Sequence, residues 1–408
     1  MVESSPAVKK ADLSKWLLFD LSVMHWRKDR KLIFALILPL LFVTSCCLGQ
    51  IRYFVQPTVS FPQADLRYFL AASQDSIAND TLFQGLSKEG YPLSYFRKIR
   101  TSVCFDNKCR LLKCVLYWNI TGRYLGFELP KGEFLSKAEH KEFTPAEYER
   151  LGMLLADELS PLGDLSYAEL APQTKTTKPS DGEVDGVSSA TAKNVLEYVV
   201  EGAAYTTYKM WNVVYGPTQQ DVMRLTSQVL SEGLVLKILE SPDLNDRIWA
   251  LNHVRGGVKI TPNLRKKIFS LISDKNYNLA ERAISALDGN DLKSDTLQMM
   301  LVEKLGTTSY AIKKLIISKF MEAPELSVPA ERKLAESLRS ANGELVSNVL
   351  DTFAKLKVND LETSRIVAEL LGNQNTFISQ KAFRYLEQSQ FKDQDIEKQM
   401  NEYRNTKR

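Results

Sequence analysis

The feature that most constrains the fold is a repeat in the second half of the chain. Apolar-periodic segments follow polar turns, and aligning them places one large apolar residue of each segment in register every 33 or 36 residues. These residues are Leu251, Leu287, Phe320, Phe353 and Leu386. Second amphipathic segments lie between them, for example 262–272 and 330–338. Because a pair of amphipathic helices cannot bury its apolar faces alone, this period predicts stacked helix pairs.

Paired helices at this spacing are similar to HEAT-type repeats. Ankyrin repeats share the period, but their Thr-Pro-Leu-His motif is absent from this sequence. The resemblance implies an all-α, HEAT-like solenoid over residues 221–408, which offers a surface and no chemistry. Such an array docks a protein partner or holds the preceding domain in place, and a purely stabilising appendage is equally consistent with the pattern.

Residues 52–220 predict an α+β domain. The segments 110–118 and 123–129 are rich in strand formers and are separated by a turn at 119–122, so they predict a hairpin. Thr144-Pro145-Ala146-Glu147 combines a capping box with proline at the first helical position, and predicts a helix that runs through Leu155. The expected fold class is therefore an α+β N-terminal domain followed by an all-α repeat domain.

A short motif in the first domain carries the chemistry. It reads Asp185-Gly186-Val187-Ser188-Ser189-Ala190-Thr191, and it resembles the attachment signature of covalent FMN-binding domains in bacterial respiratory complexes. The chain matches that signature at Asp185, Ser188, Ala190 and Thr191. It departs at Ser189, where glycine is usual, and at Lys193, where many relatives have Thr or Ser. The resemblance implies FMN joined through its phosphate to the hydroxyl of Thr191 by a flavin transferase.

The surroundings of the motif suit a phosphate and also suit an ordinary helix start. The polar stretch 172–183 predicts an exposed loop, and apolar residues at helical spacing follow Thr191. A helix N-terminus there would stabilise a phosphate through free N–H groups and the helix dipole. The same Ser and Thr residues are also typical N-caps, worth roughly 1 kcal/mol without any cofactor.

Three aromatic residues follow the motif at intervals of three. Tyr205, Tyr208 and Trp211 share one face if the segment 201–211 is helical. They could cover a flavin ring. The interpretation that such stripes favour is an aromatic seam that packs the segment on the sheet or on the next domain, because they usually serve the core.

The start of the chain predicts export. Basic residues at 27–31 precede an apolar run of twelve residues from Leu32 to Val43, which suits a signal h-region and is short of the roughly 20 residues that span a bilayer. Val43 to Cys46 resembles the bacterial lipobox, in which the cysteine becomes the lipidated first residue. The leader is long, and a start at Met24 would give an ordinary length.

Two interpretations of residues 1–51 therefore stand, a lipoprotein signal with lipidation at Cys46 or an uncleaved signal anchor. Both place a membrane-anchored protein outside the cytoplasm, in the cell envelope or periplasm, because the basic cluster precedes the apolar run.

The remaining cysteines agree with an oxidising compartment. Cys104 and Cys109 flank a turn-forming stretch and predict a disulfide. The same spacing could be half of a metal site, but only two histidines follow the leader, so no metal is expected. Cys114 is expected to be a buried apolar residue of the next strand.

Composition narrows the function. The net charge is +4, and no basic stripe with interleaved aromatics indicates a nucleic-acid partner. No set of catalytic residues and no nucleotide-binding glycine loop accompanies the repeats. Two functions remain. One is an envelope flavoprotein for electron transfer through FMN, in which the repeats dock a redox partner. The other is a flavin-free, anchored binding or assembly protein.

Overall fold

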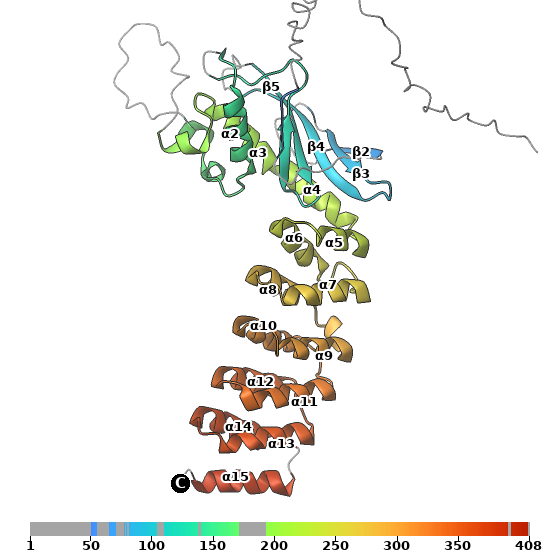
Figure 1. The fold of residues 1–408 in the computed structure, drawn as a ribbon, viewed down its shortest axis with the longest axis vertical. Coiled ribbons are helices and arrows are strands. Elements are labelled where there is room, and N and C mark those ends of the chain that lie inside the picture. Colours follow the sequence, from blue (N-terminus) through green and yellow to red (C-terminus); the bar gives the residue numbers. More distant parts are fainter. Residues whose placement is uncertain are drawn as a thin grey trace, which may run out of the picture. The chain divides into compact units, whose positions relative to one another are not determined.

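A six-stranded antiparallel sheet precedes the helices in the computed structural model, which describes residues 50–54, 65–70, 77, 79, 81–103, 110–137, 140–170, 193–390 and 393–406. The strands are β1 Arg52–Phe54, β2 Asp65–Leu70, β3 Thr81–Leu86, β4 Pro92–Thr101, β5 Leu112–Asn119 and β6 Tyr124–Glu128. They lie in the order β1-β6-β5-β4-β3-β2 (Figure 1). Within the described ranges, every helix is too short or too polar to span a bilayer.

The predicted hairpin is confirmed as β5 and β6. Its turn is held by Asn119, whose Oδ1 accepts hydrogen bonds from the backbone N–H groups of Thr121 and Arg123 at 3.1 and 2.7 Å. Gly122 completes the turn with a φ of +88°, a conformation that costs glycine little because it has no Cβ.

Three helices cover one face of the sheet. They are α2 Pro145–Ala156, α3 Ala204–Val214 and α4 Pro217–Gln228. The predicted capping box is present at the start of α2, with both reciprocal bonds between Thr144 and Glu147. Buried Trp118 of β5 donates its indole N–H to the carbonyl of Val214, at the end of α3. The expected division between residues 220 and 221 falls inside α4, whose apolar residues join the core of the sheet.

An aromatic row crosses the opposite face of the sheet. Phe54 and Tyr117 lie opposite Gly126 in register, Phe96 lies opposite Tyr117, and Phe83 lies opposite Phe96. The ring centroids are 5.2 Å apart for Phe54 and Tyr117, 5.5 Å for Tyr117 and Phe96, and 4.9 Å for Phe96 and Phe83. Rings at these distances stabilise the sheet through cross-strand contacts.

The remaining helices form a stacked array, residues 232–406, here called the array (Figure 1). One layer contains α6 Leu244–Val254, α8 Tyr277–Ser285, α10 Tyr310–Phe320, α12 Gly343–Lys355 and α14 Thr376–Gln388. The other contains α5 Glu232–Ile238, α7 Pro262–Ile272, α9 Asp295–Lys304, α11 Val328–Ser337, α13 Leu361–Glu369 and α15 Gln394–Thr406. The helices of the first layer contact one another in sequence, and each also packs on a helix of the second layer. An α+β part followed by an all-α part is therefore confirmed.

The repeat found in the sequence marks the core of the array. Leu251, Leu287, Phe320, Phe353 and Leu386 are at most 1 % exposed. The predicted polar turns supply N-caps, since the side chains of Asp243, Asn276 and Asn375 accept backbone N–H groups at the starts of α6, α8 and α14.

Candidate functional site

The residues expected to carry the flavin lie outside the described part of the chain. Asp185, Ser188, Ser189, Ala190 and Thr191 fall between residues 170 and 193. The expected lipidation site Cys46 and the expected disulfide pair Cys104 and Cys109 also lie outside it. All of these stay predictions.

Cys114 lies in β5 and is the buried apolar residue that the sequence predicts. Its thiol is free and 1 % exposed, and burial raises its pKa to about 12. A thiol this protonated is a poor nucleophile, so Cys114 fills the core of the sheet.

Both ends of the segment that bears the motif are fixed to the sheet domain. The short 3-10 helix η3 (Tyr167–Leu170) precedes it and a second one, η4 (Lys193–Tyr198), follows it. Leu170 and Val195 are both buried in the core of the sheet domain. The described residues on either side of the motif-bearing segment are therefore both anchored in the core of the sheet domain.

Arg150 of α2 binds the backbone that follows the motif-bearing segment. Its guanidinium donates to the carbonyls of Leu196, Glu197 and Val199 at 3.3, 2.9 and 3.3 Å. These carbonyls lie at the end of η4, where no further helical N–H is available to them, so the arginine supplies the missing donors.

The helical segment expected after Thr191 is described from Lys193 on. Its described part is the 3-10 helix η4, and the α-helix begins only at Ala204. Gly202 lies between them with a φ of +72°, which interrupts the helical backbone.

Tyr205 and Tyr208 lie on one face of α3, and both contact Tyr167 of η3. The rings of Tyr167 and Tyr205 stack with centroids 4.7 Å apart, and Tyr208 meets Tyr167 edge-on at 5.6 Å. The Tyr208 hydroxyl donates to the carbonyl of Leu165 at 2.7 Å. Burial, and then the two neighbouring tyrosines, raise the pKa of Tyr167 to about 12. A half-buried tyrosine cluster thus lies beside the point where the motif-bearing segment begins.

Trp211 is the most enclosed of the three aromatic candidates. It is 7 % exposed, and its indole N–H donates to the carbonyl of Asp157 at 2.9 Å. Its ring lies 4.8 Å from that of Tyr215 and directly against Gly163. These contacts make Trp211 part of the packing between α3 and the end of α2.

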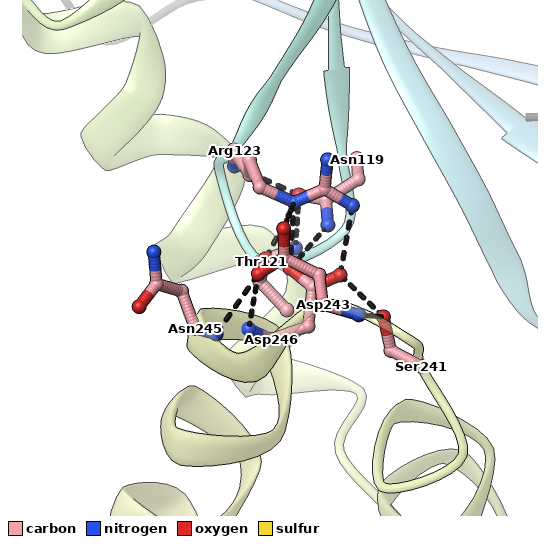
Figure 2. Close-up of polar contacts among 7 residues, drawn as sticks. All are labelled: Asn119, Thr121, Arg123, Ser241, Asp243, Asn245 and Asp246. Carbon is pink, nitrogen blue, oxygen red and sulfur yellow. Dashed lines mark hydrogen bonds and ion pairs between the residues drawn. The ribbon is translucent and has the colours of Figure 1, made fainter. Parts of the chain in front are cut away.

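A polar cluster at the junction of sheet and array centres on Asp246 (Figure 2). This carboxylate is 3 % exposed and lies in the first turn of α6. It accepts from Asn119 Nδ2 at 2.6 Å, Thr121 Oγ1 at 2.6 Å, Arg123 Nη2 at 2.9 Å and Ser241 Oγ at 2.7 Å. The β5–β6 turn supplies three of these donors, so one loop of the sheet closes on the N-terminus of one helix.

The cluster keeps Asp246 charged. Burial alone would raise the pKa of Asp246, but donors from Arg123, Thr121 and Ser241 outweigh it and lower the pKa. The N-terminus of α6 adds a favourable dipole. Arg123 is also 3.4 Å from Asp243, the N-cap of α6. The arrangement joins two parts of the protein and leaves no free coordination position for a ligand on Asp246.

Sequence reasoning missed this cluster because its partners are far apart in the chain. Asn119, Thr121 and Arg123 are 123 to 127 residues from Asp246. The sequence does show polar residues in a tight turn and an acid in the first turn of a helix. Each of these is explained by its own turn or helix end, so neither indicates that the two are in contact.

Among the described residues, no group of three or more His, Cys, Asp or Glu side chains is placed to hold a metal ion. No family model and no curated protein matches the chain.

Two solved structures, both crystal structures of engineered proteins, are similar to part of it. The first is 14% identical with a TM-score of 0.28, and the match covers 45% of this chain and 84% of the engineered one. The second is 13% identical with a TM-score of 0.29, and the match covers 49% of this chain and 57% of the engineered one. Likenesses at this level carry no argument about fold or function.

Proposed function

We propose that this protein is a membrane-anchored, extracytoplasmic flavoprotein that carries FMN covalently on Thr191 and serves in electron transfer. The observation that carries the proposal is the motif from Asp185 to Thr191, with its hydroxyl, its acid and its small neighbours. In the attachment step, the Thr191 oxygen bonds to the FMN phosphorus of FAD, AMP leaves, and the hydroxyl proton is released. The bound flavin supplies the redox chemistry, while the protein holds and shields it.

The described residues around the motif support this role. Leu170 and Val195 fix the two ends of the segment, and Arg150 holds the second end through three carbonyls. The cluster of Tyr167 and Tyr205 offers an apolar, half-buried surface next to the first end. Aromatic faces of this kind can shield a planar ring from water.

The array supplies the second half of the proposal. Its period, buried register residues and two helix layers favour a HEAT-like solenoid that docks a protein partner. In a redox protein that partner would donate or accept the flavin electrons.

Covalent attachment can be tested by its fluorescence. The full chain is co-expressed with a flavin transferase and exported, and denaturing electrophoresis is viewed under ultraviolet light. We expect a fluorescent band that is lost in Thr191→Ala and kept in Thr176→Ala, a control at a threonine of the preceding polar stretch 172–183. A dark wild-type band would refute the flavin proposal.

One structural observation favours a second candidate, a flavin-free anchored binding or assembly protein. The indole N–H of Trp211 and the hydroxyl of Tyr208 donate to the carbonyls of Asp157 and Leu165, and both rings contact neighbouring rings within the domain. In this case the Ser and Thr residues of the motif serve as ordinary helix caps. A dark band with intact folding, measured by thermal unfolding, would select this candidate.

A further inference from the structure

The array contains a cationic groove between α7 and α9. Its volume is about 650 Å³, within the range of about 300 to 1,000 Å³ typical of ligand sites. The lining residues are Pro262, Arg265, Lys266, Phe269, Ser270, Met300, Glu303, Lys304 and Thr307. Three of these side chains are basic and one is acidic. The backbones of α7 and α9 approach one another less closely than those of α9 and α11 or of α11 and α13, and the groove occupies this gap.

The floor and the rim of the groove differ in character. Phe269 is 3 % exposed and half-buried Met300 lies beside it, so the floor is apolar. Arg265 is half-buried, and its Nε has no hydrogen-bond partner within the described residues. Lys304 donates to Ser273 at 2.9 Å, and Lys266 is exposed. A ligand that fits these walls has an apolar group flanked by negative charge.

The repeat shows why positive charge remains unneutralised here. Arg332 and Arg365 occupy equivalent positions 33 residues apart, on α11 and α13. Each pairs with an aspartate 28 residues later that precedes the next helix of the same layer. Arg332 is 2.8 Å from Asp360, and Arg365 is 2.8 Å from Asp393. The repeats of α11 and α13 thus have an internal carboxylate partner for a cation at this position, whereas the equivalent residues of the α9 repeat are Met299 and Ser327.

Lys266 occupies the same position on α7, because it lies two repeat lengths of 33 residues before Arg332. The residue 28 positions later is Ser294, the N-cap of α9, whose side chain is neutral. At α7, as at α11 and α13, this position holds a cation, but here the internal carboxylate is missing. Arg265 adds a second cation, which also lies within electrostatic reach of Asp291.

We propose that the α7–α9 groove binds an acidic peptide segment of a protein partner. A carboxylate of the peptide takes, beside Lys266 and Arg265, the place that Asp360 and Asp393 take beside their arginines. A neighbouring apolar side chain of the peptide lies on Phe269 and Met300. This inference builds on the docking role proposed for the array and is independent of the flavin.

The test uses the full chain in detergent and fluorescence anisotropy of a labelled peptide, in which one Leu lies between two pairs of Asp in a Gly background. We expect Arg265→Gln/Lys266→Gln to weaken binding about tenfold or more. The control Lys355→Gln/Lys398→Gln removes the same charge from exposed lysines on α12 and α15 and should bind like wild type. Peptides with Lys for Asp, or Gly for Leu, should bind much less.

A second variant separates loss of binding from loss of folding. Ser294→Asp installs the carboxylate that Asp360 and Asp393 provide beside α11 and α13, at a position where Asp is as good an N-cap as Ser. We expect it to weaken peptide binding and to leave the melting temperature unchanged or higher. The Thr191→Ala variant should bind the peptide like wild type, so failure of the flavin proposal would not affect this result. Absence of binding, or equal binding by the groove and control variants, would overturn the inference.

Discussion

At the scale of single residues, the two most informative side chains are buried acids with opposite environments. Asp246 is surrounded by donors, which lower its pKa in spite of burial. Glu331 on α11 is 8 % exposed, and burial followed by the charge of Asp360 raises its pKa to about 7. No described residue forms an ion pair with Glu331. The first acid stabilises the fold when charged, and the second destabilises it.

Replacing Asp246 with Asn should be strongly destabilising. Arg123 would keep only its longer contact with Asp243, at 3.4 Å, and breaking a buried pair from one side costs about 3 to 5 kcal/mol. Because the folded pKa of Asp246 is lowered, its contribution is full above its unfolded pKa and is lost as the pH falls through the folded value. Urea unfolding at neutral pH measures the loss. The control Asp351→Asn removes an exposed pair with Lys381 and should cost about 0 to 1 kcal/mol.

Glu331→Gln should stabilise the protein at high pH. A raised folded pKa means that the contribution of Glu331 is most favourable below its unfolded pKa, near 4.5, and is lost as the pH rises through about 7. The full effect is at most about 3 kcal/mol. Gln is already present at the equivalent position of the preceding repeat, as buried Gln298. We expect the difference in melting temperature between variant and wild type to grow from pH 5 to pH 8. A constant difference would contradict this assignment.

At the scale of elements, local signals in the sequence predicted the structure well. The hairpin, the capping box at Thr144 and the polar turns before α6, α8 and α14 all rest on contacts within a few residues. The aromatic row was not predicted, because it depends on pairing between distant strands, such as Phe54 opposite Gly126. The type of the helix after Thr191 was not predictable either, since a period of apolar residues does not distinguish a 3-10 helix from an α-helix.

Gly126 should be indispensable to the pairing of β1 with β6. Its φ is +154°, and a Cβ added there would lie 2.3 Å from the carbonyl oxygen of Tyr53. We expect Gly126→Ala to destabilise the protein by more than about 2 kcal/mol, because the backbone of β1 must move. Gly152 in α2 is a matched control, since its added Cβ would make only an ordinary 3.7 Å contact. Gly152→Ala should stabilise by up to about 1 kcal/mol, and equal effects in thermal unfolding would contradict the argument.

At the scale of the whole molecule, residues 50–408 form one unit, and its described residues build two large apolar cores and a smaller cluster on the other face of the sheet. Ile120, in the β5–β6 turn, packs against both cores, and the Asp246 cluster surrounds the same turn. The order of the two parts and the period of the array were predictable from the sequence. Their junction was not, because it consists of contacts across more than 120 residues. The groove beside Lys266 was predictable only in part. A sequence alignment of the repeats shows that the carboxylate is missing, but it does not show the open space between α7 and α9.

The junction should couple the unfolding of the two parts. The double variant Arg123→Ala/Asp246→Ala removes both charges together, so it leaves no unpaired charge from this pair, although Asn119, Thr121 and Ser241 lose their acceptor. It also removes the link between the β5–β6 turn and α6. We therefore expect scanning calorimetry to show one transition for the wild type and two for the double variant, because each core then unfolds by itself. Asp351→Asn, which lies within the array, should keep a single transition. A double variant that still melts in one transition would show that the remaining contacts, such as those of Ile120 and Tyr91, couple the two cores without the Asp246 cluster.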